Sequence, residues 1–265
     1  MPERTLLVDT HCHLVLLDDR GLLDASLEAA SAAGVEQIVS VGLNLEDSER
    51  NRVIAEQHAG VSFTVGWHPM ESLPPDGAQV AALDQLLRHP KAVAVGEIGI
   101  DQYFRPGYHE VPLEVQQRSM RTMLELAAGH KKPVIIHDRD SHEEVLIELA
   151  AFRAVRGVMH CFSGDAAFAQ RCVDRGLHVS FAGTVTFSRS EAIQAAAAAV
   201  PESAFVVETD SPFLAPVPHR GRPNQPAFVV ATARRVAELR GDDPLRVAQQ
   251  AGDNARALFR LPVPA

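Results

Sequence analysis

Residues 6–14 read LLVDTHCHL, a short apolar run that leads directly into an aspartate and two histidines. Residues 6–9 have the length and composition of a buried β-strand. Because residues two apart in an extended chain point to the same side, His11 and His13 can direct both imidazoles at one ion. For an isolated pair of this kind, the alternative is a polar strand end with exposed imidazoles. The stretch therefore predicts a strand that ends in candidate metal ligands.

Short apolar, β-branched runs of this kind recur along the chain, with longer segments of helical spacing between them. Residues 113–128 place Met120, Met123 and Ala127 on one helical face. The alanine-rich residues 192–200 also favour a helix. Alternation of strands and helices is typical of a parallel α/β sheet. The expected strands are residues 6–9, 37–41, 61–65, 92–96, 133–136, 157–159, 177–181 and 204–207.

Eight strand and helix units in about 250 residues match the size of a (β/α)8 TIM barrel. The chain contains no long linker, so residues 1–265 are expected to form a single domain. A doubly wound open sheet is the alternative fold. Its dinucleotide-binding form is not favoured, because no glycine-rich phosphate turn follows any expected strand.

The composition restricts the class of protein. The 265 residues are 46% hydrophobic and 22% charged, which provides a large core and excludes an intrinsically disordered chain. A formal charge of -9 argues against a protein that coats nucleic acid by general charge attraction, but it permits a local cationic groove. The sequence has no apolar segment of membrane-spanning length and no signal peptide pattern, so we expect a cytoplasmic protein without membrane contact. Three cysteines cannot build a disulfide framework.

Further candidate ligands stand at or just after the ends of other strands, where a TIM barrel places its active site. They are Glu97, His137, His160 and Asp210. An unpaired carboxylate at the end of a buried strand is costly, so Glu97 needs a cation as its partner. One carboxylate can also bridge two ions. Together with His11 and His13, these side chains can hold a dinuclear centre of divalent ions such as Mg, Mn or Zn.

Two cysteines, Cys12 and Cys161, stand beside these candidate ligands and offer soft thiolate ligands as an alternative. In an extended strand, however, the alternation of side chains points each thiol away from its histidine neighbour. Packing in the core is therefore the favoured interpretation of both cysteines.

Ordered motifs occur at the expected strand ends. They are DTHCHL at 9–14, GWHP at 66–69, GEIGID at 96–101, IHDR at 136–139, MHCFSG at 159–164, ETDSPFLAP at 208–216 and RGRPNQP at 220–226. In combination they resemble the TatD family of metal-dependent deoxyribonucleases over nearly the whole chain. The resemblance implies a barrel of the metal-dependent hydrolase superfamily that cuts DNA phosphodiester bonds with divalent ions, with a preference for exonuclease action at 3′ ends.

The resemblance also implies a role for each candidate ligand. The metal positions are His11, His13 and Asp210 for one ion, His137 and His160 for the other, and Glu97 as the bridging ligand.

Catalytic roles follow from the charge of the substrate. A phosphodiester is anionic and its transition state is more so, which suits a centre of paired divalent ions. Asp210 is expected to orient or deprotonate the attacking water. His68 matches a family histidine near the scissile phosphate. Arg139 is a candidate phosphate contact, with a surface ion pair as the alternative interpretation.

The chain departs from the usual family pattern at two places. Gln102 stands before Tyr103 and Phe104, where the family commonly has an aromatic pair, and Met120 replaces the aromatic that usually follows Gln116. Both changes bear on substrate preference more than on metal binding.

The expected partner is DNA with single-stranded ends, and no obligate protein partner is indicated. Arg220 and Arg222 stand in the loop after the last strand and can form a cationic lip for DNA. Arg189 stands after the seventh strand and has the same two interpretations, a DNA contact or a solvated charge. Aromatic side chains that can stack on unpaired bases are Trp67, Tyr103 and Phe104.

Two other functions are open at this point. Another hydrolase of the superfamily, acting on a small ester, lactone or amide, would carry the same histidine pair. The phosphotriesterase type, however, needs a bridging lysine, and Lys91, Lys131 and Lys132 all stand away from strand ends. A nucleic-acid or partner-binding protein without turnover would be expected to have lost ligands, whereas all six are present.

Overall fold

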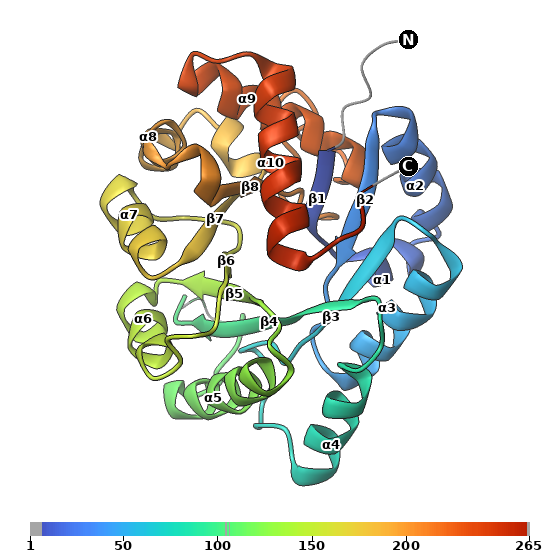
Figure 1. The fold of residues 1–265 in the computed structure, drawn as a ribbon, viewed down its shortest axis with the longest axis vertical. Helices are drawn as coiled ribbons and strands as arrows, with labels where there is room; N and C mark the ends of the chain where they lie inside the picture. Colours follow the sequence, from blue (N-terminus) through green and yellow to red (C-terminus); the bar gives the residue numbers. More distant parts are fainter. Residues whose placement is uncertain (1–6, 104, 106, 264–265) are drawn as a thin grey trace.

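Eight parallel strands surround the centre of the molecule, and helices pack outside them (Figure 1). The computed structural model describes residues 7–103, 105 and 107–263. The strands are β1 (Leu7–Cys12), β2 (Val35–Ser40), β3 (Val61–Val65), β4 (Ala92–Asp101), β5 (Val134–Arg139), β6 (Gly157–Met159), β7 (Leu177–Phe181) and β8 (Phe205–Val207). Each strand pairs with the next one along the chain, in the order β1 to β8. The predicted TIM barrel is therefore confirmed, and the open doubly wound sheet is excluded.

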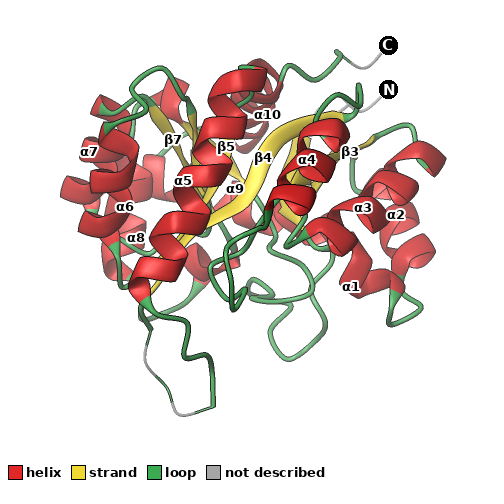
Figure 2. Ribbon diagram, turned by 90° about the horizontal axis from the view of Figure 1, so that it is seen from below, coloured by secondary structure: helices red, strands yellow, loops and turns green. Residues whose placement is uncertain are grey.

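Helices follow the strands in the predicted alternation. They are α1 (Leu14–Asp18), α2 (Leu23–Ala32), α3 (Leu45–Gln57), α4 (Gly77–Leu86), α5 (Leu113–His130), α6 (His142–Ala150), α7 (Ala166–Asp174), α8 (Glu191–Ala199), α9 (Val229–Arg240) and α10 (Pro244–Phe259). The expected helices at 113–128 and 192–200 correspond to α5 and α8. Within the described part of the chain, none of these helices combines the length and the apolar character needed to cross a membrane. In Figure 2 the longer loops gather at one end of the strands.

Three strands extend beyond their predicted ends. β1 continues to Cys12, β4 to Asp101 and β5 to Arg139. The reason is that the β4–β5 ladder continues through polar residues, pairing Gly99 with His137 and Asp101 with Arg139. A strand whose last side chains face a polar site no longer has the apolar pattern from which its end was predicted. Glu97 and His137 therefore lie inside hydrogen-bonded strands rather than in the loops after them.

Side chains and a few backbone contacts close the barrel between β8 and β1. The backbone N–H of Asp210 donates to the carbonyl of His11 (2.9 Å), and that of His13 donates to the carbonyl of Ser211 (2.8 Å). Asp9 accepts hydrogen bonds from the backbone N–H and the hydroxyl of Thr209, at 2.9 and 2.6 Å. This junction holds His11, His13 and Asp210 together across the closure.

The interior of the barrel has its own apolar cluster. Six strands contribute Val8, Val39, Ala94, Ile135, Val158 and Val206, and α10 adds Ala255 and Phe259. Leu261, two residues beyond the end of α10, joins the same cluster. Since Gln37 near the start of β2 donates to the carbonyl of Pro262 (2.9 Å), this end of α10 covers the amino-terminal opening of the barrel. The carboxyl-terminal opening of the barrel is not covered by α10, and the candidate ligands lie at this end.

Phe259→Ala is expected to lower the free energy of unfolding by about 3–5 kcal/mol, because it leaves a cavity where the phenyl ring packs inside the barrel. Urea unfolding of both proteins measures the loss. Leu245→Ala is the matched control, since Leu245 lies on the same helix with 49% of its surface exposed and should change stability by no more than about 0.5 kcal/mol. Equal effects of the two substitutions would contradict the placement of α10.

Candidate metal centre

The carboxyl-terminal ends of six strands bring the candidate ligands to one place. β1 supplies His11 and β4 supplies Glu97, both buried, while β5 supplies the part-buried His137. Side chains just beyond the strands complete the set. They are His13 after β1, His68 after β3, His160 after β6 and Asp210 after β8.

Glu97 lies at the centre of this set, and each of its oxygens faces a different group of donors. Its Oε1 lies 2.7 Å from His137 Nδ1, 3.0 Å from His160 Nε2 and 3.5 Å from His68 Nε2. Its Oε2 lies 3.4 Å from His11 Nε2 and 4.0 Å from His13 Nε2. One carboxylate thus contacts five imidazoles in two groups.

Asp210 joins the second of these groups. Its Oδ1 lies 3.3 Å from His13 Nε2 and 3.7 Å from His11 Nε2, and those two nitrogens lie 3.3 Å from each other. Three sets of ligand atoms lie within 4.8 Å of one another: His11 with His13 and Asp210, His11 with Glu97 and His160, and His68 with Glu97 and His137. Imidazole nitrogens and carboxylate oxygens that converge at this spacing fit a divalent ion.

The electrostatics of the site favour ionised carboxylates. Burial opposes ionisation of Glu97, but the charges of His160 and His68 outweigh it and hold the pKa of Glu97 well below its usual range. The pKa of Asp210 is also lowered, because the hydrogen bond with His13 outweighs burial. Buried anions of this kind are the ligands that a cation needs.

Three imidazoles of the site have raised pKa values. In each case burial opposes the charge and a neighbouring carboxylate outweighs it: Asp210 for His13, Asp101 for His137, and Glu97 with Glu208 for His160. A proton on these rings occupies the position that a metal ion would take.

Comparison with known proteins agrees with this geometry. The family model described as TatD related DNase matches residues 8–260. The chain belongs to this family. An uncharacterized metal-dependent hydrolase TatD from Mycobacterium tuberculosis is 39% identical over 263 residues, which cover 96% of this chain and 98% of that protein. The 3'-5' ssDNA/RNA exonuclease TatD of Salmonella typhimurium is 32% identical over 245 residues, covering 90% of this chain and 93% of that protein.

The solved structure of YjjV, a TatD homologue from Escherichia coli K12, has the same fold. It superposes with a TM-score of 0.89 and 30% sequence identity, covering 98% of this chain and 99% of that chain. The protein is therefore a TatD-family member among relatives named metal-dependent hydrolases.

Two carboxylates that sequence reasoning missed orient ligands of this TatD-family site. Asp101 Oδ2 lies 3.0 Å from His137 Nε2, and Glu208 Oε1 lies 3.1 Å from His160 Nδ1. Ser180 and the backbone N–H of Cys161 donate to Glu208 at 2.5 and 2.8 Å. Partners of this kind fix the ring orientation and tautomer of a ligating histidine. Asp101 is the last residue of the GEIGID motif, and Glu208 is the first residue of the ETDSPFLAP motif. Their positions in these motifs could have indicated both residues from the sequence.

A cleft of about 550 Å³ opens over the ligands of the TatD-family chain. Its wall carries Arg139, the candidate phosphate contact, and also Tyr108, which the sequence analysis missed. The Tyr108 hydroxyl donates to Asp101 Oδ2 (3.1 Å) and accepts a hydrogen bond from Arg139 (3.0 Å). The guanidinium of Arg139 lies 3.9 Å from the centre of the Tyr103 ring. Tyr103 thus supports Arg139 and is not itself part of the cleft wall.

Other expected substrate contacts lie elsewhere. Trp67 is 5% exposed and its indole N–H donates to the carbonyl of Leu73 (2.9 Å), so its ring is packed in the core and is not free to stack on a base. Arg220 lies over the Phe187 ring at 4.0 Å, and both Arg220 and Arg222 are exposed outside the cleft wall. Phe104 lies outside the described residues.

The cysteines do not contribute to the donor groups among the described residues. Cys12 is fully buried, and burial raises the pKa of both the Cys12 and the Cys161 thiol well above the usual value. Metal binding needs the thiolate, so these environments favour packing, as the strand alternation predicted.

Proposed function

We propose that the protein is a divalent-metal-dependent deoxyribonuclease that hydrolyses DNA phosphodiester bonds and shortens single-stranded DNA from its 3′ end. The observation that carries the proposal is the position of Glu97, with one oxygen toward His11 and the other toward His137 and His160. A relative named as a 3'-5' ssDNA/RNA exonuclease supports the choice of substrate.

Two divalent ions, Mg, Mn or Zn, would be held by the two groups of donors. His11, His13 and Asp210 would hold one ion and His137 with His160 the other, with Glu97 between them. His68 Nε2 lies 3.5 Å from Glu97 Oε1, beside the donors on the side of His137. When bound, such ions lower the pKa of water and neutralise charge on a phosphoryl group.

The protein's own residues would position the substrate and move its proton. Asp210 is ionised because its pKa is lowered, and it borders the cleft, so it can accept a proton from a water molecule. Arg139 lines the same cleft and offers guanidinium N–H groups to a phosphoryl oxygen. His68 also borders the cleft and can donate to the same phosphate.

The cleft has the size and lining expected for one nucleotide unit. Its volume of about 550 Å³ lies within the usual range for small-molecule sites, roughly 300–1,000 Å³. Phe213 lies on its rim, 46% exposed, with its ring centre 5.9 Å from that of His13. We assign to Phe213 the stacking role that burial denies to Trp67.

The test is cleavage of a single-stranded oligonucleotide labelled at its 5′ end, with chelator-treated protein and added Mg or Mn. A metal-dependent ladder that shortens from the 3′ end supports the proposal, and duplex DNA and RNA of the same sequence measure the preference for substrate. If the protein binds two ions and leaves every oligonucleotide intact, the nuclease assignment is wrong. Small esters, lactones and amides are then the substrates to assay.

Arg139→Ala is expected to raise KM for the oligonucleotide by about tenfold or more, because a charge-assisted contact with phosphate is lost. Arg139→Lys keeps the charge and should recover part of the affinity, although it cannot form the same fork of hydrogen bonds. Steady-state kinetics measures both. Arg88→Ala is the control, because Arg88 is paired with Asp84 on the surface outside the cleft. An unchanged KM in Arg139→Ala would remove Arg139 from the substrate site.

Metal affinity is expected to rise with pH, by about tenfold per pH unit for each proton displaced. The raised pKa values of His13, His137 and His160 stabilise the folded metal-free protein below pH 6.5, the ordinary histidine value, and this stabilisation is lost as pH rises through the raised values. Over the same pH interval the metal-loaded protein becomes more stable relative to the metal-free protein, because metal binding no longer has to displace these protons.

The difference in Tm between Mn-loaded and EDTA-treated protein should therefore widen as the pH is raised through and above 6.5, the ordinary histidine value. Thermal unfolding across this range measures it. A difference that stays constant would show that these imidazoles do not exchange protons for metal.

A further inference from the structure

A second cavity, of about 780 Å³, lies at the opposite end of the barrel from the metal centre. Its wall is built from the end of α5 and the loop to β5, the segment before β6, the turn before β7, and the end of α10. These segments meet at the amino-terminal ends of β5, β6 and β7. The cavity is therefore separate from the cleft over Glu97.

The wall of this cavity is basic. It carries Lys131, Lys132, Arg156, Arg260 and His178, and it includes no aspartate or glutamate. Two of the three lysines of the chain are here, in a protein whose formal charge is -9. Within the described ranges, no carboxylate lies within ion-pair distance of Lys131, Arg156 or Arg260, all of which are exposed. Clustered cations without counter-charges repel each other, so a bound anion would stabilise the arrangement.

The local backbone positions these cations. Lys131 and Arg260 follow the ends of α5 and α10 in the left-handed conformation, with φ of 52° in both. Arg156 lies against Gly176, where an added Cβ would be 2.0 Å from Nη1, and this Nη1 reaches the carbonyl of Arg175 at 3.5 Å. A cation at a helix end can be explained by the helix dipole, but Arg156 belongs to no helix.

The pKa directions of one lysine and one arginine side chain are consistent with cations close enough to interact. Burial lowers the pKa of Lys132, and the charge of Arg260 lowers it further. Burial likewise lowers the pKa of Arg175, with a contribution from Arg156. Arg156 and Arg260 of the cavity wall thus each repel a neighbouring cation.

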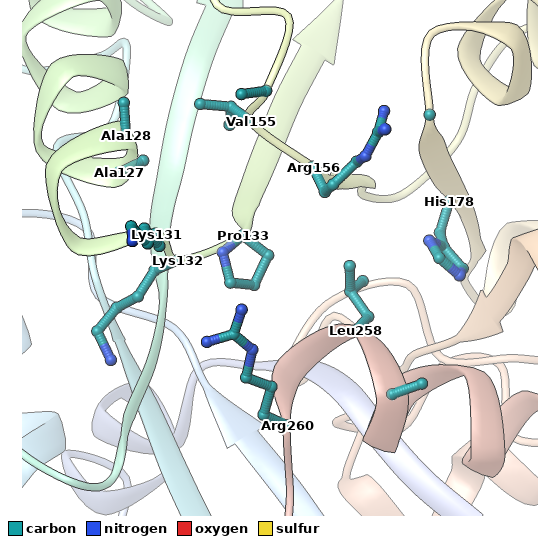
Figure 3. A pocket seen from close by; sticks show the side chains of 13 residues that line it. Ala127, Ala128, Lys131, Lys132, Pro133, Val155, Arg156, His178, Leu258 and Arg260 are labelled. Atoms are coloured by element: carbon teal, nitrogen blue, oxygen red, sulfur yellow. The ribbon is translucent and has the colours of Figure 1, made fainter.

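Apolar surface separates the two groups of cations. Figure 3 shows Pro133 and Leu258 between Arg156 and His178 on one side and Lys132 and Arg260 on the other. Val155 and Ala127 extend this apolar surface. A ligand that satisfies the whole wall needs both negative charge and an apolar portion. The cavity volume of about 780 Å³ lies within the usual range for small-molecule sites, roughly 300–1,000 Å³.

We propose that this basic cavity binds a nucleoside phosphate, with its phosphates at Arg156 and Arg260 and its base against Pro133 and Leu258. Guanidinium groups are suited to bidentate phosphate contacts, and a base can pack on proline and leucine side chains. The proposal does not depend on nuclease activity, since the cavity shares no residue with the metal centre.

Isothermal titration calorimetry of the Mg-loaded protein with AMP and ADP tests it, with adenosine and pyrophosphate as partial ligands. Both nucleotides should bind more tightly than either partial ligand. The double variant Arg156→Gln with Arg260→Gln should weaken nucleotide binding at least about tenfold. Nuclease activity and Tm of this variant report whether it is folded. Arg189→Gln, which removes an exposed charge outside the cavity, should leave binding unchanged.

Because nucleotides also bind to metal ions, Glu97→Gln is titrated in parallel. Binding that persists in Glu97→Gln and is lost in the double arginine variant supports the cavity. Binding lost in Glu97→Gln and kept in the double variant would assign the nucleotide to the metal centre and overturn the proposal. No binding of either nucleotide would overturn it as well, and so would equal affinity for pyrophosphate and ADP, because the apolar surface would then have no role.

Discussion

Glu97→Ala is expected to abolish DNA cleavage, with turnover reduced by at least about a thousandfold, while the barrel stays folded. The substitution removes the one carboxylate that faces both His11 and His137, so neither group of donors keeps its full set of ligands. Metal analysis should find less than one ion per chain after gel filtration. Circular dichroism establishes that the variant is folded.

Glu71→Ala is the matched control, because Glu71 is a carboxylate on the wall of the same cleft that accepts a hydrogen bond from Asn44 (2.9 Å). It should keep its metal and most of its activity. A folded Glu97→Ala protein that turns over at the normal rate would disprove the dinuclear proposal.

Asp210→Asn is expected to lower kcat by about a thousandfold through a different route. An amide cannot take up a proton from water, and it is a weaker metal ligand beside His11 and His13. The donors around Glu97, His137 and His160 remain, so we expect close to one bound ion per chain instead of two.

Metal content and single-turnover cleavage of Asp210→Asn, measured together, separate this prediction from that for Glu97. NMR titration of the metal-free variant adds an independent test. Since the hydrogen bond with Asp210 opposes the effect of burial on His13, its removal should lower the pKa of the His13 imidazole. Full metal content combined with normal kcat would exclude Asp210 from the reaction.

Most of the fold could be predicted from sequence because the strands of a TIM barrel are buried on both faces. Runs such as 61–65 (VSFTV) and 177–181 (LHVSF) place an apolar residue at every second position, with Ser, Thr or His between them, and the structure has strands with these same bounds. The apolar pattern also predicted that β4 ends at residue 96, whereas its backbone hydrogen bonds with β5 continue to Asp101. Burial predicts where an apolar strand begins, but a ladder of backbone hydrogen bonds continues through polar residues.

The assembly of the candidate ligands was predictable for a similar reason. Parallel strands end at the same side of a barrel, so histidines at those ends must lie close together. What could not be predicted was the direction of individual side chains. The contact of Glu208 with His160 joins residues 48 apart, and the contact of Tyr108 with Arg139 joins residues 31 apart.

Trp67 illustrates the same limit, because the sequence indicated a ring that can stack on unpaired bases. Its indole instead turns toward Leu73 and the core. Whether the Trp67 ring points into the core or toward the cleft depends on the path of the loop after β3.

The closure between β8 and β1 has a consequence for synthesis of the chain on the ribosome. Asp9 binds Thr209 across 200 residues, and the interior valines are covered by Phe259 of α10. During translation, β1 and the residues of the barrel interior therefore lack their contacts with Thr209 and α10 until nearly all of the sequence has left the ribosome. The last helix to be translated completes the core, so the nascent polypeptide needs protection from aggregation for most of its elongation.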